Sequence, residues 1–329
     1  MSFRDEVKHS MLGSEAEVRT EFMKRCLILA SHGKKGHLRQ ALAVARRLPF
    51  TIDVMEVGPQ STVPAIDEDI ALVIGAGRQS IAPARTIARG RKPRPFVALL
   101  QPVAWRASCF DLVWAPAHDR YAAPFARRGR LETATAPSAV TAEERAAGLA
   151  EINRRLPGLA KPVVGVLIGG ANQAHRFGPT EAVELAARLA GFAKAHDASL
   201  LITTSRRTGA DLTALLAARL GDAADLFVDG ATPDADASTL YAGILARSDA
   251  IVATADSVAM MSDVAAAGVP LYGWRLPGGK AKFERFYGSL LAHGTMRWFD
   301  GGLSHWTYPP LDAAQVIAEA LQKRMGLVR

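Results

Sequence analysis

The sequence predicts an α/β protein in which two Rossmann-like domains face each other, each a parallel sheet with helices on both faces. The chain has 329 residues, of which 49% are apolar and 22% charged, a balance typical of a globular protein long enough for two domains. Short apolar runs alternate with stretches of helical periodicity along most of its length. Such alternation is typical of β-α-β units, whose strands are parallel.

Seven elements are expected in the first half. The predicted strands are 25–30, 52–57, 71–74, 96–100 and 112–115, and the predicted helices are 36–48 and 81–89. Apolar runs such as Cys26–Ala30 have the length of a strand and are too short to span a membrane.

The second half repeats this scheme and ends on a helix. Its predicted strands are 163–168, 199–203, 226–229, 250–253 and 270–273, and its predicted helices are 180–196, 208–220, 239–246, 257–267, one that ends at His293, and 312–325. Two prolines and a glycine in 155–162 suit a linker. We therefore expect domains over 1–158 and 159–310, followed by a C-terminal helix within 311–329.

The formal net charge of +8 lies in the first half. Residues 1–160 hold 24 Lys and Arg against 16 Asp and Glu, whereas residues 161–329 hold 16 of each. The clustered cations are Arg85, Arg89, Arg91, Lys92, Arg94, Arg120, Arg127, Arg128 and Arg130. Such a face would be attracted to anionic lipid by roughly 1 kcal/mol per residue, or it reflects composition alone. Without a recognition helix or aromatic-interleaved basic strand, no nucleic acid partner is expected.

The cysteines and the start of the chain indicate a cytoplasmic protein. Cys26 and Cys109 are too few for a disulfide framework and lack metal-ligand spacing. Charged Arg4, Asp5 and Glu6 precede any apolar run, which disfavours a secretion signal. Peripheral association with the inner face of the membrane is left open by the basic first domain.

The segment 254–272 is the strongest functional motif. It follows a buried-strand pattern and continues as a helix that Asp256 or Ser257 can cap and that Gly268 and Pro270 end. Free N–H groups at such a helix start favour a phosphate. Any α/β protein contains strand-helix units, but an apolar helix gains nothing from the second acid, Asp263.

This segment resembles the nucleotide-ribose region of GT-B glycosyltransferases, and most closely the mitochondrial-fission ELM-like family, whose bacterial members are described as glycosyltransferases. The resemblance is carried by Thr254, Asp256, Ser257, Met260, Ser262, Asp263, Gly268 and Pro270. In the wider pattern the position of Asp263 is usually Glu. The resemblance implies GT-B architecture, a nucleotide-sugar site, and a terminal helix that packs back on the first domain.

The loop after the first predicted strand resembles a family signature and the acceptor loop of the peptidoglycan lipid-intermediate N-acetylglucosaminyltransferase. The matches include Gly33, Gly36, His37 and Gln40, while Ser31-His32 replaces the family's leading Asp. His37 is a candidate base for an acceptor hydroxyl, because imidazole titrates near neutral pH. The alternative is a histidine at the helix start that only binds phosphate or caps the helix.

A second strand exit in the first half, 74–80, contains Gly75, Gly77 and Arg78. It resembles the family's Gly-x-Gly-Arg step, which implies that Arg78 clamps a phosphate. A purely structural tight turn is the alternative.

Two loops of the second half complete the expected nucleotide-sugar site. Gly169 and Gly170 allow a close backbone approach after their strand, and Asn172, His175 and Arg176 follow as candidate sugar or diphosphate contacts. The next strand ends in hydroxyls and guanidiniums that resemble the family's pattern and suit diphosphate oxygens: Thr204, Ser205, Arg206, Arg207 and Thr208.

These motifs predict a nucleotide-sugar glycosyltransferase of GT-B type that acts on a cytoplasmic or membrane-associated acceptor. The alternative is a non-catalytic GT-B-like scaffold that binds a nucleotide or a partner. No metal or cofactor is expected besides the nucleotide sugar, because Asp67-Glu68-Asp69 and Asp234-Ala235-Asp236 precede an element rather than follow a strand. The sequence lacks the Gly-x-Gly-x-x-Gly fingerprint and the Tyr-x-x-x-Lys pair expected of a nicotinamide-dependent epimerase or reductase. The sugar, base, acceptor, stereochemistry and oligomeric state stay open.

Overall fold

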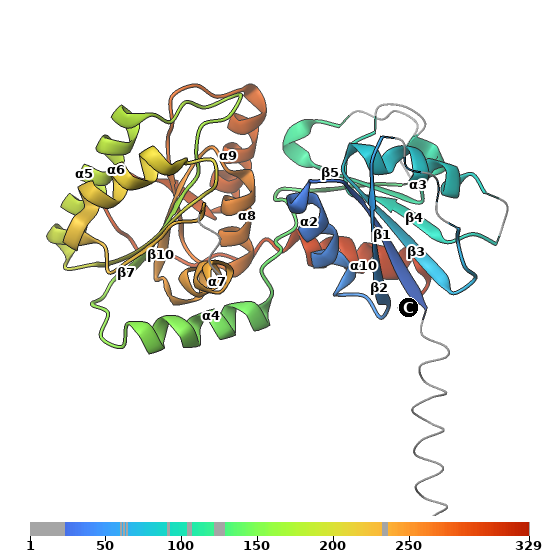
Figure 1. Ribbon diagram of the computed structural model, residues 1–329, viewed down its shortest axis with the longest axis horizontal. Helices are drawn as coiled ribbons and strands as arrows, with labels where there is room; N and C mark the ends of the chain where they lie inside the picture. Colours follow the sequence, from blue (N-terminus) through green and yellow to red (C-terminus); the bar gives the residue numbers. More distant parts are fainter. Residues whose placement is uncertain are drawn as a thin grey trace, which may run out of the picture. The chain divides into compact units, whose positions relative to one another are not determined.

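The computed structural model describes residues 24–59, 61, 63, 65–90, 93–103, 107–121, 129–231 and 236–328. These residues form two compact units (Figure 1). Unit 1 holds the described residues up to Ala115, those between Tyr121 and Glu132, and those from Ala314 on. Unit 2 holds Pro116–Arg120 and the described residues from Thr133 to Ala313.

Unit 1 is built on a six-stranded sheet of order β2-β1-β3-β4-β5-β6. Every strand pair whose register is described is parallel, and Ile28 lies opposite both Val54 and Ile74. The elements are β1 (Arg25–Ser31), α2 (Lys35–Ala45), β2 (Thr51–Val57), β3 (Ile70–Ala76), α3 (Ile81–Ala88), β4 (Phe96–Leu99), β5 (Leu112–Pro116), β6 (Arg130–Thr133) and α10 (Ala313–Met325).

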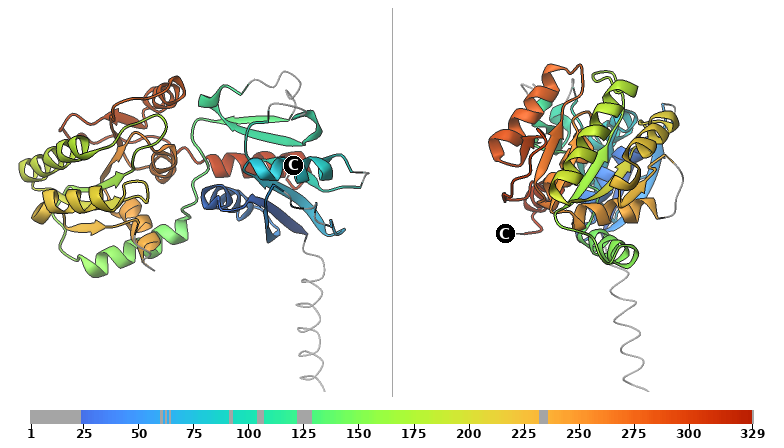
Figure 2. Two further views of the ribbon diagram at one scale, coloured as in Figure 1. Left: turned by 45° about the horizontal axis from the view of Figure 1, so that its top comes forward. Right: turned by 90° about the vertical axis from the view of Figure 1, so that its left-hand side faces the viewer.

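Helices cover both faces of this sheet. Leu29 and Val73 pack with Ile87 of α3 on one face, while Ile28 and Ile74 are buried on the other. Helices α2 and α10 lie along that other face (Figure 2). Because β1 and β3 are buried on both faces, their sequences are nearly continuous apolar runs.

Helix α10 joins unit 1 although it lies at the far end of the sequence. Its inner face is almost fully buried, with Ile317 and Leu321 at 0% exposure. Gln322 Nε2 donates to the carbonyl of Arg47, just beyond the end of α2, at 3.3 Å. The hydrophobic stripe of α10 therefore completes the core of unit 1.

Unit 2 is a second six-stranded sheet, of order β12-β11-β10-β7-β8-β9, and all its pairs are parallel. Its strands are β7 (Val163–Ile168), β8 (Ser199–Thr204), β9 (Leu226–Val228), β10 (Ala250–Thr254), β11 (Leu271–Trp274) and β12 (Met296–Trp298). Its helices are α4 (Ala142–Arg155), α5 (Pro179–His196), α6 (Ala210–Leu220), α7 (Ala237–Arg247), α8 (Val258–Ala267) and α9 (Ala281–His293).

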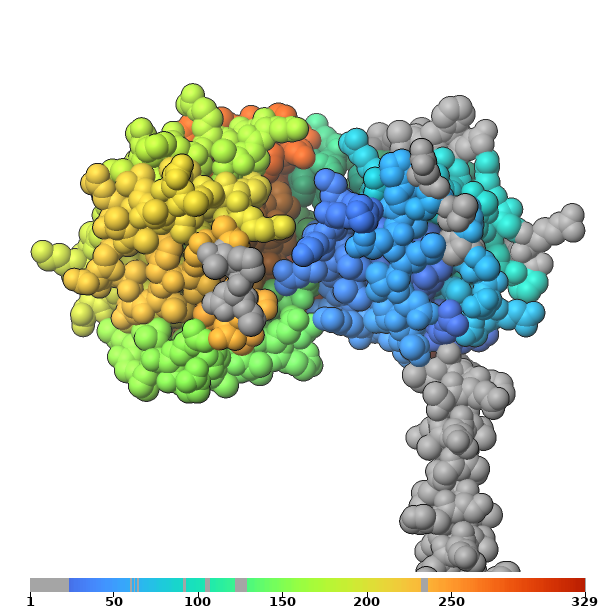
Figure 3. Space-filling model, viewed as in Figure 1, coloured from blue at the N-terminus to red at the C-terminus, as the bar shows by residue number. Residues whose placement is uncertain are grey.

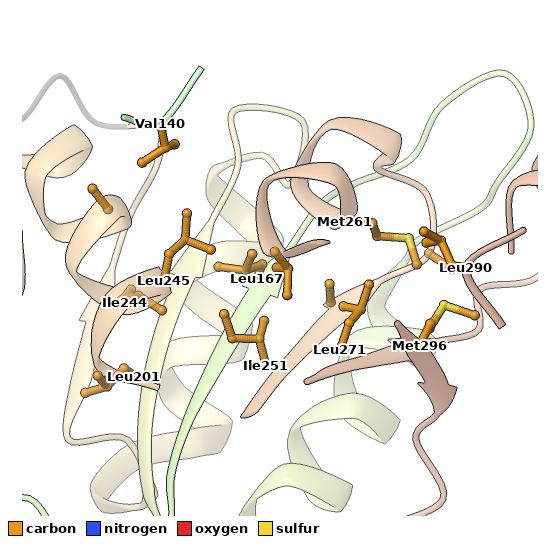
Figure 4. Packing of buried hydrophobic residues seen from close by; sticks show 14 of the residues in the cluster. Val140, Leu167, Leu201, Ile244, Leu245, Ile251, Met261, Leu271, Leu290 and Met296 are labelled. Atoms are coloured by element: carbon orange, nitrogen blue, oxygen red, sulfur yellow. The ribbon is translucent and has the colours of Figure 1, made fainter. Parts of the chain in front are cut away.

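The core of unit 2 has two layers, one on each face of the sheet. On one face Leu167 and Ile251 pack with residues of α7, α8 and α9, such as Met261 and Leu290 (Figure 4). On the other face Val166, Ile168 and Val252 pack with residues of α5 and α6. The alternation along each strand thus sends successive side chains to opposite helical layers.

The predicted α/β class is confirmed, with two Rossmann-like units that each have a parallel sheet and helices on both faces. The elements β6, α4 and β12 were not predicted. Helix α4 lies before the expected boundary at residue 158, and it packs against α7 of unit 2. Arg91, Lys92, Arg127 and Arg128 of the basic clusters and the first 23 residues lie outside the described residues. None of the described helices is both long and apolar enough to cross a membrane.

Candidate functional site

Each sheet reverses its strand order once. In unit 1 the chain leaves β1 for β2 on one side and returns to β3 on the other, and in unit 2 it leaves β7 for β8 and returns to β10. Loops at the carboxyl ends of two such strands diverge to opposite faces and leave a crevice where open α/β sheets bind ligands. The predicted site residues that follow β7 and β10 meet at the switch point of unit 2.

Asp256, just after β10, is the centre of this arrangement. Its side chain is 0% exposed and forms an ion pair with Arg207 at 2.8 Å. Its carboxylate also accepts from the Gly170 N–H at 3.1 Å and from the Thr254 hydroxyl at 2.7 Å. A buried carboxylate is tolerated when it is paired and fully hydrogen-bonded in this way. Asp256 therefore fastens the loops after β7, β8 and β10 to one another.

Gly169 and Gly170 allow these loops to touch. A Cβ at Gly169 would lie 2.2 Å from an Asp256 oxygen, and one at Gly170 would lie 2.2 Å from the Arg207 carbonyl. The Gly169 N–H donates to the Thr254 hydroxyl at 2.7 Å, and the Arg207 guanidinium donates to the Gly170 carbonyl at 3.3 Å. A methyl group at Gly169 would displace the buried Asp256 carboxylate, and one at Gly170 would displace the backbone of the loop after β8.

The threonine hydroxyls at and after the end of β8 form hydrogen bonds with backbone groups of the protein. The Thr208 hydroxyl donates to the Gly169 carbonyl at 2.5 Å and accepts from the Ser205 N–H at 3.0 Å. The Thr204 hydroxyl accepts from the Gly230 N–H at 3.2 Å. Both threonines are 3% exposed. Their geometry suits shaping of the loops rather than direct contact with a ligand.

Loop 171–175 is held by Asn172 and His175. The Asn172 side chain accepts from the N–H groups of Ala174 and His175 and donates to the Asp256 carbonyl at 3.2 Å. The Tyr287 hydroxyl donates to the Ala255 carbonyl at 2.6 Å, so it accepts from His175 Nε2–H at 3.1 Å. Burial lowers the pKa of His175, and its Nδ1 has no partner among the described residues.

Cationic groups remain on the solvent side of this network. Arg206, on the same turn as Arg207, and Arg176 are exposed, and neither side chain is bonded to the described part of the chain. The Ser257 hydroxyl caps α8 by accepting from the Met260 N–H at 3.4 Å. The first-turn amides of Val258 and Ala259 have no acceptor among the described residues. Guanidiniums beside a helix start are suited to an anion.

Asp263 and Met260 are placed differently. The Tyr241 hydroxyl of α7 donates to the Asp263 carboxylate at 2.9 Å, one and a half turns into α8. Met260 is half-buried and packs against the core. Neither residue joins the Asp256 network.

In unit 1 the switch point brings Ser31, His37 and Gly77 together. A Cβ at Gly77 would lie 2.4 Å from the Ser31 hydroxyl and 2.6 Å from His37 Nδ1, and the φ of Gly77 is +89°. The Ser31 hydroxyl accepts from the Gln79 N–H at 3.0 Å. Partial desolvation, and then the charge of Lys34, lower the pKa of His37. The imidazole is thus neutral at neutral pH.

The other predicted site residues of unit 1 belong to the same loops and helix as Ser31, His37 and Gly77 or to the adjoining strand β3. Gly33 has φ +69°, whereas Gly36 has space for a side chain. Arg78 is exposed, Gln40 is half-buried, and Gly75 is packed against Leu99. The start of α2 belongs to the exposed surface of unit 1 (Figure 3).

Three partners were missed by sequence reasoning. Ser31 was noted only as a replacement for the family's Asp, and Tyr241 and Tyr287 were not assigned to the site. Tyr241 is 22 positions from its partner Asp263, and Tyr287 is 112 positions from its partner His175. No local pattern joins residues so far apart.

No group of metal-ligating side chains occurs in the described residues. Asp69 and Asp53 are instead bound by the guanidinium of Arg25, at 3.1 and 2.7 Å. Asp234 and Ala235 of the other acidic motif lie outside the described residues.

The fold and its sites define a protein of two Rossmann-like units with a glycine-lined loop cluster at each switch point. The family model described as Mitochondrial fission ELM1 matches residues 35–325. The chain therefore belongs to that family.

Two curated relatives resemble the chain at 28% identity. One is the mitochondrial fission protein ELM1 of Arabidopsis thaliana, aligned over 278 residues, which are 78% of this chain and 64% of the plant protein. The other is the uncharacterized protein RP120 of Rickettsia prowazekii, aligned over 187 residues, 56% of this chain and 52% of that protein. The chain thus spans less than two thirds of the length of both relatives.

Two solved structures are similar to this chain along most of its length. A UDP-GlcNAc 2-epimerase from Neisseria meningitidis, crystallised with UDP-GlcNAc, has a TM-score of 0.48 at 10% identity and covers 91% of this chain and 100% of its own. A glycosyl transferase of family 9 from Veillonella parvula has a TM-score of 0.44 at 13% identity, with 93% and 98% covered. At such identities a likeness concerns the fold alone.

Proposed function

We propose that the chain is a nucleotide-sugar-dependent glycosyltransferase, with the nucleoside diphosphate sugar bound at the β7/β10 switch point of unit 2. The observation that carries the proposal is the Asp256 network, which holds three strand exits in backbone contact beneath exposed guanidiniums. A rigid, glycine-lined loop cluster at the start of a helix suits a diphosphate.

The side chains divide into ligands and supports. Arg206 and the first-turn amides of α8 are proposed to bind the diphosphate, since they are on the solvent side of the network. Arg207, which is engaged by Asp256, supports the loop that carries Arg206. Asp263 is proposed to accept a ribose hydroxyl while Tyr241 orients its carboxylate.

In the proposed transfer, an acceptor hydroxyl oxygen forms a bond to the anomeric carbon and the bond from that carbon to the diphosphate breaks. The hydroxyl proton passes to a general base; His37 of unit 1 is the candidate that the sequence motif predicts, and its lowered pKa leaves the imidazole able to accept a proton at neutral pH. The negative charge that develops on the diphosphate is stabilised by Arg206 and the start of α8. Activity should therefore fall as the pH drops through the lowered pKa of His37.

The first test is ligand binding by thermal shift and calorimetry. UDP, GDP, ADP, CDP and dTDP, and their hexose conjugates, would be added to the whole chain with and without Mg²⁺. A ligand at 100 times its Kd stabilises the folded state by about 2.7 kcal/mol. We expect one base to be selected, with little dependence on Mg²⁺.

Variants separate the site from unspecific charge effects. Arg206→Gln should weaken the selected nucleotide at least tenfold, whereas Arg219→Gln, an exposed arginine of α6, should not. Binding without turnover of any sugar conjugate on a range of acceptors would favour the alternative, a non-catalytic nucleotide-binding scaffold. No binding at all would reject the nucleotide site.

We also propose that the basic excess of the first 160 residues draws the protein to anionic membranes as a peripheral protein. Co-sedimentation with vesicles that contain phosphatidylserine should exceed that with pure phosphatidylcholine and should vanish at high salt. Equal binding to both vesicles would contradict an electrostatic attachment.

A further inference from the structure

A separate cavity of about 320 Å³ opens at the carboxyl ends of β11 and β12 in unit 2. Aromatic rings and four charged side chains line it, and none of the lining residues belongs to the Asp256 network. We propose that this cavity binds a phosphorylated monosaccharide. Its volume lies at the lower end of the range for small-molecule sites, which suits one sugar ring with a phosphate.

The cavity has a fixed aromatic wall. A Cβ at Gly273 would lie 3.0 Å from Trp298 Cζ3, so glycine allows the indole to lie against β11. Tyr287 meets the same indole edge to face, with ring centroids 5.2 Å apart. Trp274 is 9% exposed and packs against Phe299 at 6.0 Å. These contacts fix the rings, so the wall can contact the apolar edge of a sugar without loss of side-chain freedom.

Two guanidiniums provide the anion site. The Arg275 guanidinium lies 3.7 Å from the centroid of the Trp298 ring, and this stacking orients its N–H donors. Glu284 contacts it only at 3.5 Å. Arg188 of α5 is exposed and has no ion pair or hydrogen bond to the described residues. Both guanidiniums line one cavity, and guanidiniums match phosphate geometry.

Two carboxylates make the site selective for more than a bare anion. Glu184 lies one turn before Arg188 on α5 and is exposed, yet the two do not form an ion pair. Asp300 uses one oxygen to accept from the Gly302 N–H at 2.9 Å. Carboxylates accept hydrogen bonds from hydroxyls but repel free phosphate. The mixed set therefore favours a molecule that carries both a phosphate and several hydroxyls.

The test is direct calorimetric titration of the whole chain with hexose 1-phosphates and hexose 6-phosphates. The matching free hexoses and inorganic phosphate serve as comparison ligands. At least one hexose phosphate should bind, and neither comparison ligand should bind within tenfold of its affinity. Because the cavity shares no residue with the proposed nucleotide site, Arg206→Gln should leave this binding unchanged.

The variants Arg188→Gln and Arg275→Gln should each raise the Kd at least tenfold. Lys194→Gln, another exposed cation of α5 outside the cavity, should not change it. Unchanged thermal unfolding of Arg188→Gln would show that the loss is local. The proposal is overturned if no hexose phosphate binds, if inorganic phosphate binds as tightly, or if binding survives both arginine variants.

Discussion

At the scale of single residues, the molecule depends most on one buried charge. Asp256 holds Arg207, Thr254 and the Gly170 amide, all on different loops or strand ends. The two partners of the ion pair do not contribute equally to stability, because the Asp256 side chain is fully buried and that of Arg207 is 41% exposed. Removing the acid leaves buried donors unpaired, whereas removing the arginine lets water reach the carboxylate.

Asp256→Asn should lower the free energy of unfolding by about 1.5–3 kcal/mol, because an amide group must face donors that the carboxylate accepted from. Arg207→Gln should cost less, since its side chain is 41% exposed and water can take its place beside the carboxylate. Urea unfolding of both variants measures the difference. Equal losses would contradict the central role of Asp256.

The two thiols should differ in reactivity. Cys26 is 0% exposed in β1, and burial raises the pKa of its thiol to about 12. Cys109 is partly exposed. Iodoacetamide should therefore label Cys109 in the native protein and Cys26 only after denaturation, because the reactive species is the thiolate. Mass spectrometry of the labelled peptides checks the order, and rapid native labelling of Cys26 would show that β1 opens readily.

At the scale of elements, helices α4 and α7 cross in backbone contact. A Cβ at Gly148 would lie 2.3 Å from the Gly243 nitrogen, and one at Gly243 would lie 2.4 Å from the Gly148 carbonyl. A capping box of Thr141 and Glu144 starts α4. This pair of glycines sets the distance between the helices and brings the Ile152 side chain into the core.

Gly148→Ala should destabilise unit 2 by about 1–3 kcal/mol, because backbone atoms of α7 must move. The matched control is Gly191→Ala in α5, where no atom lies within 4 Å of the new methyl group. That change should stabilise the protein by about 1 kcal/mol through helix propensity. Thermal unfolding compares the two, and a neutral Gly148→Ala would mean that the helices can separate at no cost.

Central elements were predictable and peripheral ones were not. Strand β7 is apolar from end to end, and β1 is apolar between Arg25 and Ser31, because both faces of each strand are covered, so their sequences identify them. Strand β12 is three residues long with exposed Arg297, and it acquires its conformation only by pairing with β11. Polar α4 shows little apolar periodicity, since only Gly148 and Ile152 are buried.

The candidate site was predictable in its glycines and less so in its side chains. Motif resemblance located Gly169, Gly170, Arg207 and Asp256, and the structure brings these together. The use of Thr208 inside the protein depends on a contact across 39 positions, which no local pattern contains. Strand order, which creates the switch point, is likewise a property of tertiary pairing.

At the scale of the whole molecule, stability should depend on buried histidines. Burial lowers the pKa of His118 and His175, most strongly through desolvation, while Asp119 or Asp256 acts in the opposite direction. The unfolded chain then binds more protons than the folded one once the pH falls below the ordinary histidine value of about 6.5. The free energy of unfolding should therefore decrease from there down to the lowered pKa values.

Urea titrations at pH 7.5 and 5.5 measure this loss. His175→Gln should reduce the difference between the two pH values, whereas His305→Gln, at an exposed position, should leave it unchanged. A difference that is the same in all three proteins would assign the acid sensitivity to other groups.

The core of unit 1 is completed by a helix that follows unit 2 in the sequence. Helix α10 fills the core that β1 and β3 begin, so the material of this unit is split between the two ends of the described sequence. During synthesis, the strands of unit 1 are made before those of unit 2, but α10, which completes their core, is made after every strand of unit 2. Unit 1 therefore keeps part of its apolar surface exposed while the whole of the second sheet is translated, although its strands are made earlier.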